Sequence, residues 1–235
     1  NFWSPRLRWA NVTLDNFVTV FREAGIVEAV FTSVATSLIA VVISLVIGFA
    51  VATILVRGQR NALLRTILDI IVAMPLGIPA VIFGAGFLFT YSRPPIILYG
   101  TWWVLVVVYV TLMLPFTTRM QLSGMLQLGS AYREASRVCG ASGLMTDLRI
   151  VLPLMRASMG GAAALMFVLL THEFTASVLV RSPRNQVMGT VLFDYWANGS
   201  FPVVAAIALV MTAVTAVGVV FAMLIGGRDV LSRLS

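Results

Sequence analysis

The side chains best suited to chemistry are an adjacent base and acid, His172 and Glu173, inside a long apolar stretch. An ionisable pair in a membrane-spanning segment is a functional candidate, because burying charge in lipid is costly. Zinc protease chemistry requires the pattern H-E-x-x-H, but Ala176 occupies the position of the second histidine. His172 is also the only histidine, and no second acid lies near the pair in the sequence. These features argue against a membrane-embedded enzyme, and we expect no catalytic residues.

The residue content also disfavours nucleotide and metal chemistry. A P-loop uses a lysine to reach the β- and γ-phosphates of ATP, and all 16 cationic residues of this chain are arginines. Cys139 is the only cysteine, which excludes an internal disulfide and a thiolate metal cluster. We expect it to pack as a small apolar residue, and we expect no metal or cofactor to be bound by this chain.

The composition indicates a membrane protein. Of the 235 residues 60% are hydrophobic and only 11% are charged, and a soluble domain of this size cannot bury so much apolar surface. The net charge of +7 would suggest nucleic acid in a soluble protein. Here anionic lipid headgroups and the orientation of the loops explain it better, and we expect no nucleic-acid partner.

The apolar runs predict transmembrane helices, since a bilayer core requires about 20 apolar residues in a helix. Backbone groups in lipid must be satisfied within the segment, which favours helices over strands. We predict an all-α, polytopic transmembrane bundle with five spans, at about 31–56, 66–91, 96–118, 158–180 and 202–225.

The distribution of arginines predicts the orientation of these spans. One set of loops is richer in arginine than the other, and by the positive-inside rule it is cytoplasmic. This places the N-terminus outside and the C-terminus in the cytoplasm. The arginines of the richer set are Arg57, Arg60, Arg65, Arg119, Arg133, Arg137, Arg149, Arg156, Arg228 and Arg233.

Residues 1–30 are expected to form an extracytoplasmic segment, and residues 31–235 the transmembrane domain. The chain begins at Asn1 and shows no signal-peptide core, so we expect it to be part of a longer protein or to have lost its start. Residues 14–30 predict an amphipathic helix that lies on the outer membrane surface or caps the bundle. Its apolar positions at near-helical spacing are Leu14, Phe17, Val18, Phe21 and Ile26.

Helix-breaking residues interrupt two of the spans. Pro75 and Pro79 lie in the second span and Pro115 in the third. Such breaks suit a bundle that lines a pathway, and they are equally compatible with simple kinks. In the fourth span Gly160 and Gly161 predict a close helix approach.

The longest loop between spans, residues 121–154, has the features of a docking element. A short helix is expected with Ala131, Tyr132, Ala135 and Val138 on one side, and Gly140 ends it. Ser142 can cap a second helix, and Pro153 marks the turn into the next span. Two short amphipathic helices that meet at a glycine suit the groove of another protein.

This loop resembles the EAA signature of bacterial ABC importer permeases, E-A-A-x3-G-x9-I-x-L-P. The spacing agrees throughout, and Ser136 replaces the third small residue of the pattern. The resemblance extends from about residue 14 to the end of the chain, but only the loop is specific. The residues to which the resemblance assigns ATPase coupling are Glu134, Ala135, Ser136, Gly140, Ala141, Ile150, Leu152 and Pro153.

The resemblance implies a type I ABC importer permease fold and a set of partners. The loop would be the coupling helix that docks on a dimer of cytoplasmic ATPase subunits, which bind ATP and Mg²⁺. A second permease half and an extracytoplasmic substrate-binding protein would complete the transporter in the bacterial inner membrane. Since family members usually have six spans or more, the chain either lacks a first span or is the second half of a fused double permease.

The substrate is expected to be a small solute. The stretches 173–183 and 191–200 resemble the iron(III) class of these permeases, and related classes for polyamines, thiamine or phosphonates share the arrangement. His172 and Glu173, together with Pro75 and Pro79, are candidates for lining the translocation path. The alternative for the ionisable pair is that it holds helices together near the outer mouth.

The outward loop 181–201 is a candidate contact for the binding protein. Arg181, Arg184, Tyr195 and Trp196 suit a protein interface, and they also suit an interfacial aromatic belt. A secondary transporter driven by an ion gradient is the main rival function. It would explain the spans and Glu173, but it would leave the glycine-broken loop unexplained.

Overall fold

The computed structural model describes residues 13–57 and 62–226, and these residues form helices without any strand. Within them, three helices are long and apolar enough to cross a membrane, and two bent helix pairs raise the number of spans to five if each pair is one span. The predicted all-α, multi-spanning architecture is therefore confirmed.

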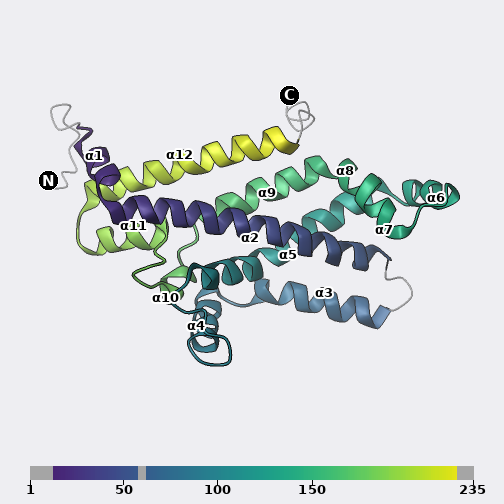
Figure 1. Ribbon diagram of the computed structural model, residues 1–235, viewed down its shortest axis with the longest axis horizontal. Coiled ribbons are helices and arrows are strands. Elements are labelled where there is room, and N and C mark those ends of the chain that lie inside the picture. The colour runs from purple at the N-terminus through teal and green to yellow at the C-terminus, as the bar shows by residue number, and fades with distance from the viewer. Residues whose placement is uncertain (1–12, 58–61, 227–235) are drawn as a thin grey trace. The chain divides into compact units, whose positions relative to one another are not determined.

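The helices follow one another with short connections (Figure 1). In chain order they are α1 (Asp15–Arg22), α2 (Ala24–Arg57), α3 (Ala62–Gly77), α4 (Ala80–Tyr91), α5 (Trp102–Leu128), α6 (Ala131–Val138), α7 (Gly143–Thr146), the π-helix η3 (Asp147–Val151), α8 (Leu152–Leu154), α9 (Arg156–Thr171), α10 (Ser177–Val180), α11 (Met188–Ala197) and α12 (Phe201–Gly226).

The chain forms two compact units, and the long helices contribute residues to both. Unit 1 comprises residues 1–39, 80–109 and 168–217, and unit 2 comprises residues 40–79, 110–167 and 218–235.

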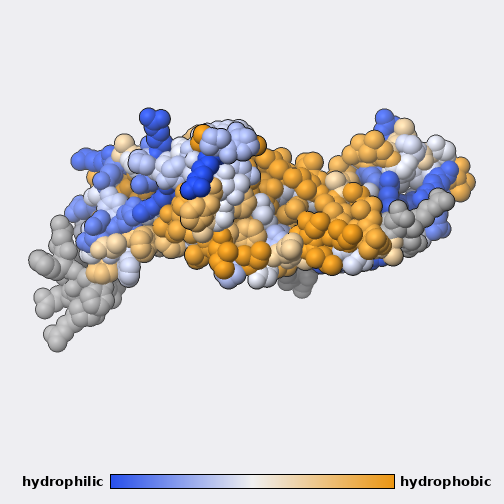
Figure 2. Space-filling model, turned by 90° about the horizontal axis from the view of Figure 1, so that it is seen from below, coloured by the Kyte–Doolittle hydropathy of each residue, from blue (hydrophilic) through white to orange (hydrophobic). Residues whose placement is uncertain are grey.

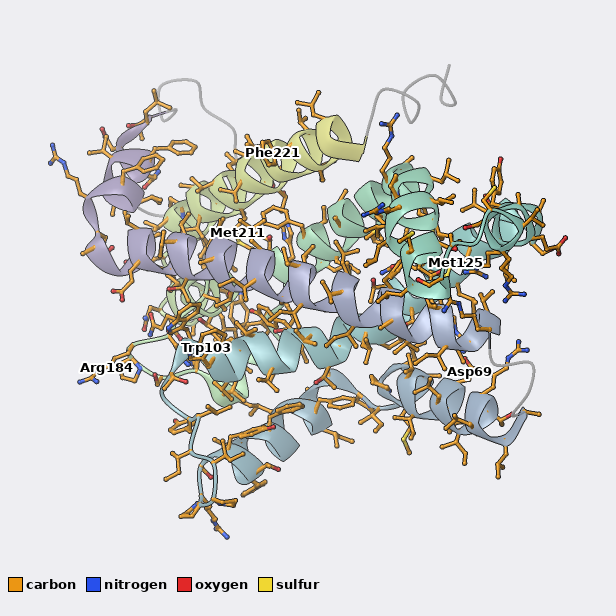
Figure 3. All side chains as sticks on the ribbon, turned by 45° about the vertical axis from the view of Figure 1, so that its right-hand side comes forward. Asp69, Trp103, Met125, Arg184, Met211 and Phe221 are labelled. Atoms are coloured by element: carbon orange, nitrogen blue, oxygen red, sulfur yellow. The ribbon has the colours of Figure 1, made fainter. Side chains whose placement is uncertain are left out.

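The core of unit 1 joins α1, α2, α11 and α12. Ile26 of α2 and Ile207 of α12 are fully buried in it, together with Val20 of α1 and Met188 of α11. Figure 3 shows Met211 between α12 and α2, where it belongs to the same core. A hydrogen bond from the backbone N–H of Met188 to Ser33 Oγ, 2.8 Å long, fixes the start of α11 against α2.

The core of unit 2 is formed by α2, α5 and part of the segment that follows α5. Ala52 of α2 and Met125 of α5 pack there against Val151 and Met155. Gly48 of α2 allows α5 to approach closely, because a methyl group added at Gly48 would lie 2.7 Å from Thr117 Cγ2 of α5.

The amphipathic helix at the N-terminus is shorter than predicted. It ends at Arg22, and the backbone of Glu23 is extended before α2 begins at Ala24. The buried side of α1 also differs from the predicted one. Val20 packs in the core of unit 1, whereas Val18 and Phe21 are exposed. Tertiary packing on α11 and α12 selected this side, so α1 caps the unit with one face and leaves an apolar face uncovered.

Two of the predicted spans are interrupted where the backbone cannot continue as a helix. The second span breaks between Gly77 and Ala80, because Pro79 has no N–H and disfavours the helical conformation at the residue before it. Pro75 and Pro115 stay inside helices. The fourth span ends at Thr171 and resumes only at Ser177, so the predicted continuous helix 158–180 is wrong.

The third span begins later and ends later than predicted. Gly100 has a φ of +84°, a left-handed conformation that a right-handed helix cannot include, and α5 starts only at Trp102. The helix then continues to Leu128. The close approach predicted at Gly161 is not formed, since a methyl group added there would meet nothing within 4 Å.

Many large apolar side chains remain exposed on the helices, as the hydrophobic areas in Figure 2 show. On α12, for example, Leu209, Val217 and Phe221 are all more than half exposed. Such surface is unfavourable in water, and lipid is the solvent that removes this cost.

Two glycines of α4 offer a matched test of how this helix packs within unit 1. A methyl group at Gly84 would lie 2.9 Å from the carbonyl oxygen of Ala176, whereas one at Gly86 would meet nothing within 4 Å. We expect Gly84→Ala to destabilise the protein by about 1–3 kcal/mol, because a backbone atom cannot yield easily. Gly86→Ala should be neutral or stabilising. Thermal unfolding of the detergent-solubilised variants measures this, and equal melting temperatures would contradict the close contact.

Candidate functional site

The segment that follows α5 is a compact, bent unit of short helices, here called the bent segment (residues 129–155). It is shorter than the predicted loop 121–154 at its start, because α5 continues to Leu128. Gly129 and Gly140 have φ values of +71° and +78°, which end α5 and α6 in left-handed turns. The predicted break at Gly140 is therefore present. Figure 1 shows the two helices that this break separates, α6 and α7, beside each other.

The predicted cap of the second short helix is also present. Ser142 is extended, and its side chain accepts a hydrogen bond of 3.3 Å from the backbone N–H of Met145. The helix continues through η3 and α8, and Pro153 lies inside α8. The chain then bends by 70° before α9, so the turn into the next span comes at Met155 and not at Pro153.

The residues that match the EAA signature divide between the two sides of the bent segment. Glu134, Ala135 and Gly140 are exposed, as is Pro153. Ala141, Ile150 and Leu152 are half-buried. Ser136 is buried, and its hydroxyl lies 2.7 Å from that of Thr146. The serine that departs from the signature therefore links α6 to α7 by a hydrogen bond.

The outer side of the bent segment carries several large apolar side chains that no described residue covers. Val138 is 87% exposed and Leu144 is 68% exposed. These two side chains belong to a set, here called the apolar face, whose members come from α6, α7 and η3: Tyr132, Val138, Leu144, Met145 and Leu148. Cys139 beside it is exposed too, so the expectation that it packs in a core is wrong.

The inner side is held by a buried carboxylate, Asp147, which no sequence motif indicated. The side chain of Asp147 is 4% exposed, and its Oδ2 lies 2.6 Å from Nη2 of Arg57, the last residue of α2. The same Nη2 donates a hydrogen bond of 2.5 Å to the carbonyl oxygen of Gly143. Arg133 of α6 approaches the other carboxylate oxygen at 3.7 Å, which is an ion pair but too long for a hydrogen bond.

An apolar layer continues this attachment. Val151 and Met155 pack on Ala52 of α2 and on Met125 of α5. Figure 3 shows Met125 close to the bent segment, and its sulfur lies 3.9 Å from Nη2 of Arg133. Both polar and apolar contacts therefore hold the bent segment against the rest of unit 2.

His172 and Glu173 lie in unit 1, at the point where α9 has ended, and not deep in a continuous helix. Glu173 Oε1 accepts a hydrogen bond of 2.7 Å from the backbone N–H of Ala176, and Oε2 accepts one of 3.0 Å from that of Ser177. The Ser177 hydroxyl also bonds to Oε2, and it lies 2.9 Å from the hydroxyl of Tyr109. The carboxylate thus organises the start of α10, while His172 is exposed.

The predicted outward loop 181–201 contains the helix α11, which makes up about half of it. Arg181 forms an ion pair of 2.8 Å with Asp194, and the Tyr195 hydroxyl donates to Glu23. Burial, together with that bond and the negative charge of Glu23, raises the pKa of Tyr195 to about 12, so it stays a neutral donor at physiological pH. Arg184 and Trp196 are exposed, and Figure 3 shows Arg184 extending away from the ribbon.

An aromatic row accompanies this helix. The rings of Phe174 and Phe193 are 5.1 Å apart, and those of Phe193 and Trp196 are 5.8 Å apart.

Among residues 13–57 and 62–226 there is no group of three or more histidine, cysteine or acidic side chains able to hold a metal ion.

This fold is shared by known ABC importers. The chain superposes with a TM-score of 0.74 on a chain from a bacterial ABC transporter involved in the import of alginate, at 18% identity, over 94% of this chain and 85% of that one. The fold is that of type I ABC importer permeases, as predicted. Residues 44–228 match the family described as the binding-protein-dependent transport system inner membrane component, and the protein belongs to this family.

Relatives with curated names agree with this membership. An ABC transporter permease of Sinorhizobium fredii is 31% identical over 206 residues, which cover 86% of this chain and 36% of that protein. This chain thus spans about a third of that relative. A permease named for 2-aminoethylphosphonate transport in Salmonella paratyphi A is 26% identical over 86% of this chain and 76% of its own length. A ferric transport permease of Actinobacillus pleuropneumoniae is 22% identical over 86% of this chain and 30% of its own length.

The bonds of Glu173 predict different effects for the two neighbouring ionisable residues. Glu173→Ala removes acceptors from two backbone N–H groups, and each unpaired group costs about 1–3 kcal/mol. His172→Ala removes an exposed side chain and should change the stability by less than about 0.5 kcal/mol. Thermal unfolding compares them, and similar melting temperatures for the two variants would show that the carboxylate does not hold α10 in place.

Proposed function

We propose that this protein is the membrane-spanning subunit of an ATP-driven importer, and that the bent segment is where it docks on a separate ATPase subunit. The observation that carries the proposal is the apolar face, which stays uncovered although the other side of the bent segment is firmly packed. An exposed apolar patch on a well-anchored element marks an interaction site.

The chemistry of the bent segment suits docking by helices in a groove. Val138 and Leu144 offer apolar anchors, and the exposed Glu134 can accept hydrogen bonds from the partner. Gly140 provides the bend, because its positive φ strains other residue types. ATP and Mg²⁺ would then be bound by a dimer of the ATPase subunits, and this chain would transmit motion without hydrolysing ATP.

The remaining partners follow from alternating access. A second permease half, identical or homologous, would complete the pathway, and lipid would cover the outer apolar surface. A binding protein would meet the opposite end of the spans, where Arg184 and Trp196 are exposed on unit 1. This arrangement puts the N-terminus outside and the bent segment in the cytoplasm, in accordance with the arginine distribution.

The translocation path would run beside the two broken spans. Pro79 interrupts one of them, and Glu173 and His172 lie at the break of the other. Broken helices at membrane depth occur where they line a cavity or are buried in protein. Because Glu173 already accepts three hydrogen bonds, its role in the path is to shape the break, while His172 is free to face solute.

The substrate is a small solute, and we weigh iron(III) and 2-aminoethylphosphonate as the two main candidates. The stretches around Glu173 and Tyr195 resemble the iron(III) class. Among the relatives named for a substrate, the permease for 2-aminoethylphosphonate is 26% identical, one for sulfate is 23% identical and the ferric one is 22% identical. Uptake of radiolabelled iron(III) and of 2-aminoethylphosphonate by cells with and without the gene separates them. Collapse of uptake by an uncoupler alone, with no ATPase attached to the purified protein, would favour a secondary transporter instead.

A charge placed on the apolar face should release the ATPase subunit. Val138→Glu puts a carboxylate into the expected interface, where it would be buried without a partner. We expect the amount of ATPase that copurifies, measured by mass spectrometry, to fall about tenfold or more, which corresponds to about 1.4 kcal/mol.

Gln127→Glu is the matched control, because Gln127 is exposed at the end of α5, outside the apolar face. It adds the same charge and should keep the ATPase. Equal retention of the ATPase by both variants would place the docking surface elsewhere.

A further inference from the structure

The bent segment is attached to α2 at two points by a single side chain. Arg57 Nη2 contacts the Asp147 carboxylate just after α7 and the carbonyl oxygen of Gly143 at its start. Gly143 also makes room for the arginine, because a methyl group there would lie 2.9 Å from Arg57 Nη1. One guanidinium therefore holds both ends of α7.

This attachment resists separation because the carboxylate is buried. Moving the bent segment away from α2 would strand Asp147, whose side chain is 4% exposed, without its nearest cation. Leaving a buried charge unpaired is strongly unfavourable. The apolar contacts of Val151 and Met155 with Ala52 would be lost at the same time.

A second ion pair of unit 2 lies between α3 and α5 and does not reach the bent segment. Asp69 of α3 pairs with Arg119 of α5 at 2.9 Å, and these side chains are 40% and 47% exposed. Exposed pairs of this kind contribute little, because water and salt screen them. The pair also joins two spans to each other and does not include the bent segment.

We propose that Asp147 and Arg57 are positioning residues that make the bent segment and the end of α2 move as one body, so that α2 follows the ATPase more closely than α3 does. The proposal rests on the proposed function, since it assumes that the bent segment docks there. α2 suits the task, because it is a single helix of 34 residues without an internal proline. Its other end is fixed to α11 through Ser33.

The experiment measures distances between spin labels in the complete complex, purified with its ATPase subunits and reconstituted in lipid. One label replaces the exposed Arg149 of η3, and the other replaces Ile54 of α2 or Ile67 of α3, which are equally exposed at 45%. Cys139→Ser removes the native thiol. Each pair is measured without nucleotide and after trapping with ATP and vanadate, with labelled permease diluted by unlabelled permease.

We expect the 54–149 distance to stay the same in both states and the 67–149 distance to shift. Arg57→Gln should make the 54–149 distribution broaden and shift on trapping. The variant should still fold, because Arg133 remains beside Asp147. Arg57→Lys should restore the narrow distribution only in part, since an ammonium lacks the planar fork of guanidinium. Arg119→Gln, which removes the other ion pair, should behave as the parent.

A 54–149 distance that shifts in the parent as much as the 67–149 distance would overturn the proposal. An Arg57→Gln variant indistinguishable from the parent would also overturn it. Failure of the proposed function looks different, because in that case no ATPase subunit copurifies with the parent protein at all.

Discussion

The position of the bent segment depends on a buried carboxylate. Asp147 is enclosed between the end of α2 and α6, with Arg57 at 2.6 Å and Arg133 at 3.7 Å. Such a group is stable only while its cation stays in place, and this ties three helices together more specifically than apolar contacts can. Apolar packing tolerates sliding, whereas a short ion pair with a second hydrogen bond to Gly143 permits one arrangement.

Because the inner side of the bent segment is fixed, the apolar side chains on its outer side stay exposed. Val138 and Leu144 cannot turn inward, because Ser136, Thr146 and Asp147 already occupy the inner surface of α6 and α7. A flexible loop with the same composition would collapse on the nearest helices. In the proposed transporter, the ATPase subunit would offset the cost of leaving these apolar side chains uncovered, as lipid does on α12.

The predictions from sequence succeeded where a local pattern specifies the structure. The spacing of Glu134, Gly140 and Pro153 identified the family, and the break at Gly140 and the cap at Ser142 follow from local backbone rules. They failed where tertiary contacts compete with those rules. The side of α1 that is buried and the length of α5 depend on what each helix packs against, as does the exposure of Cys139.

The sequence by itself determined the solvent, the class of fold and the family, because apolar runs, arginine placement and the spacing of the signature are one-dimensional properties. Only the tertiary structure decided which charges meet. Arg57 and Asp147 are far apart along the chain, and neither belongs to the signature. For Glu173 the sequence left open whether it lines a path or holds helices together, and only the tertiary structure shows that its carboxylate accepts hydrogen bonds from two backbone N–H groups beyond the end of α9. Ion pairs and hydrogen bonds act over a few ångströms in space, and no pattern along the chain encodes that proximity.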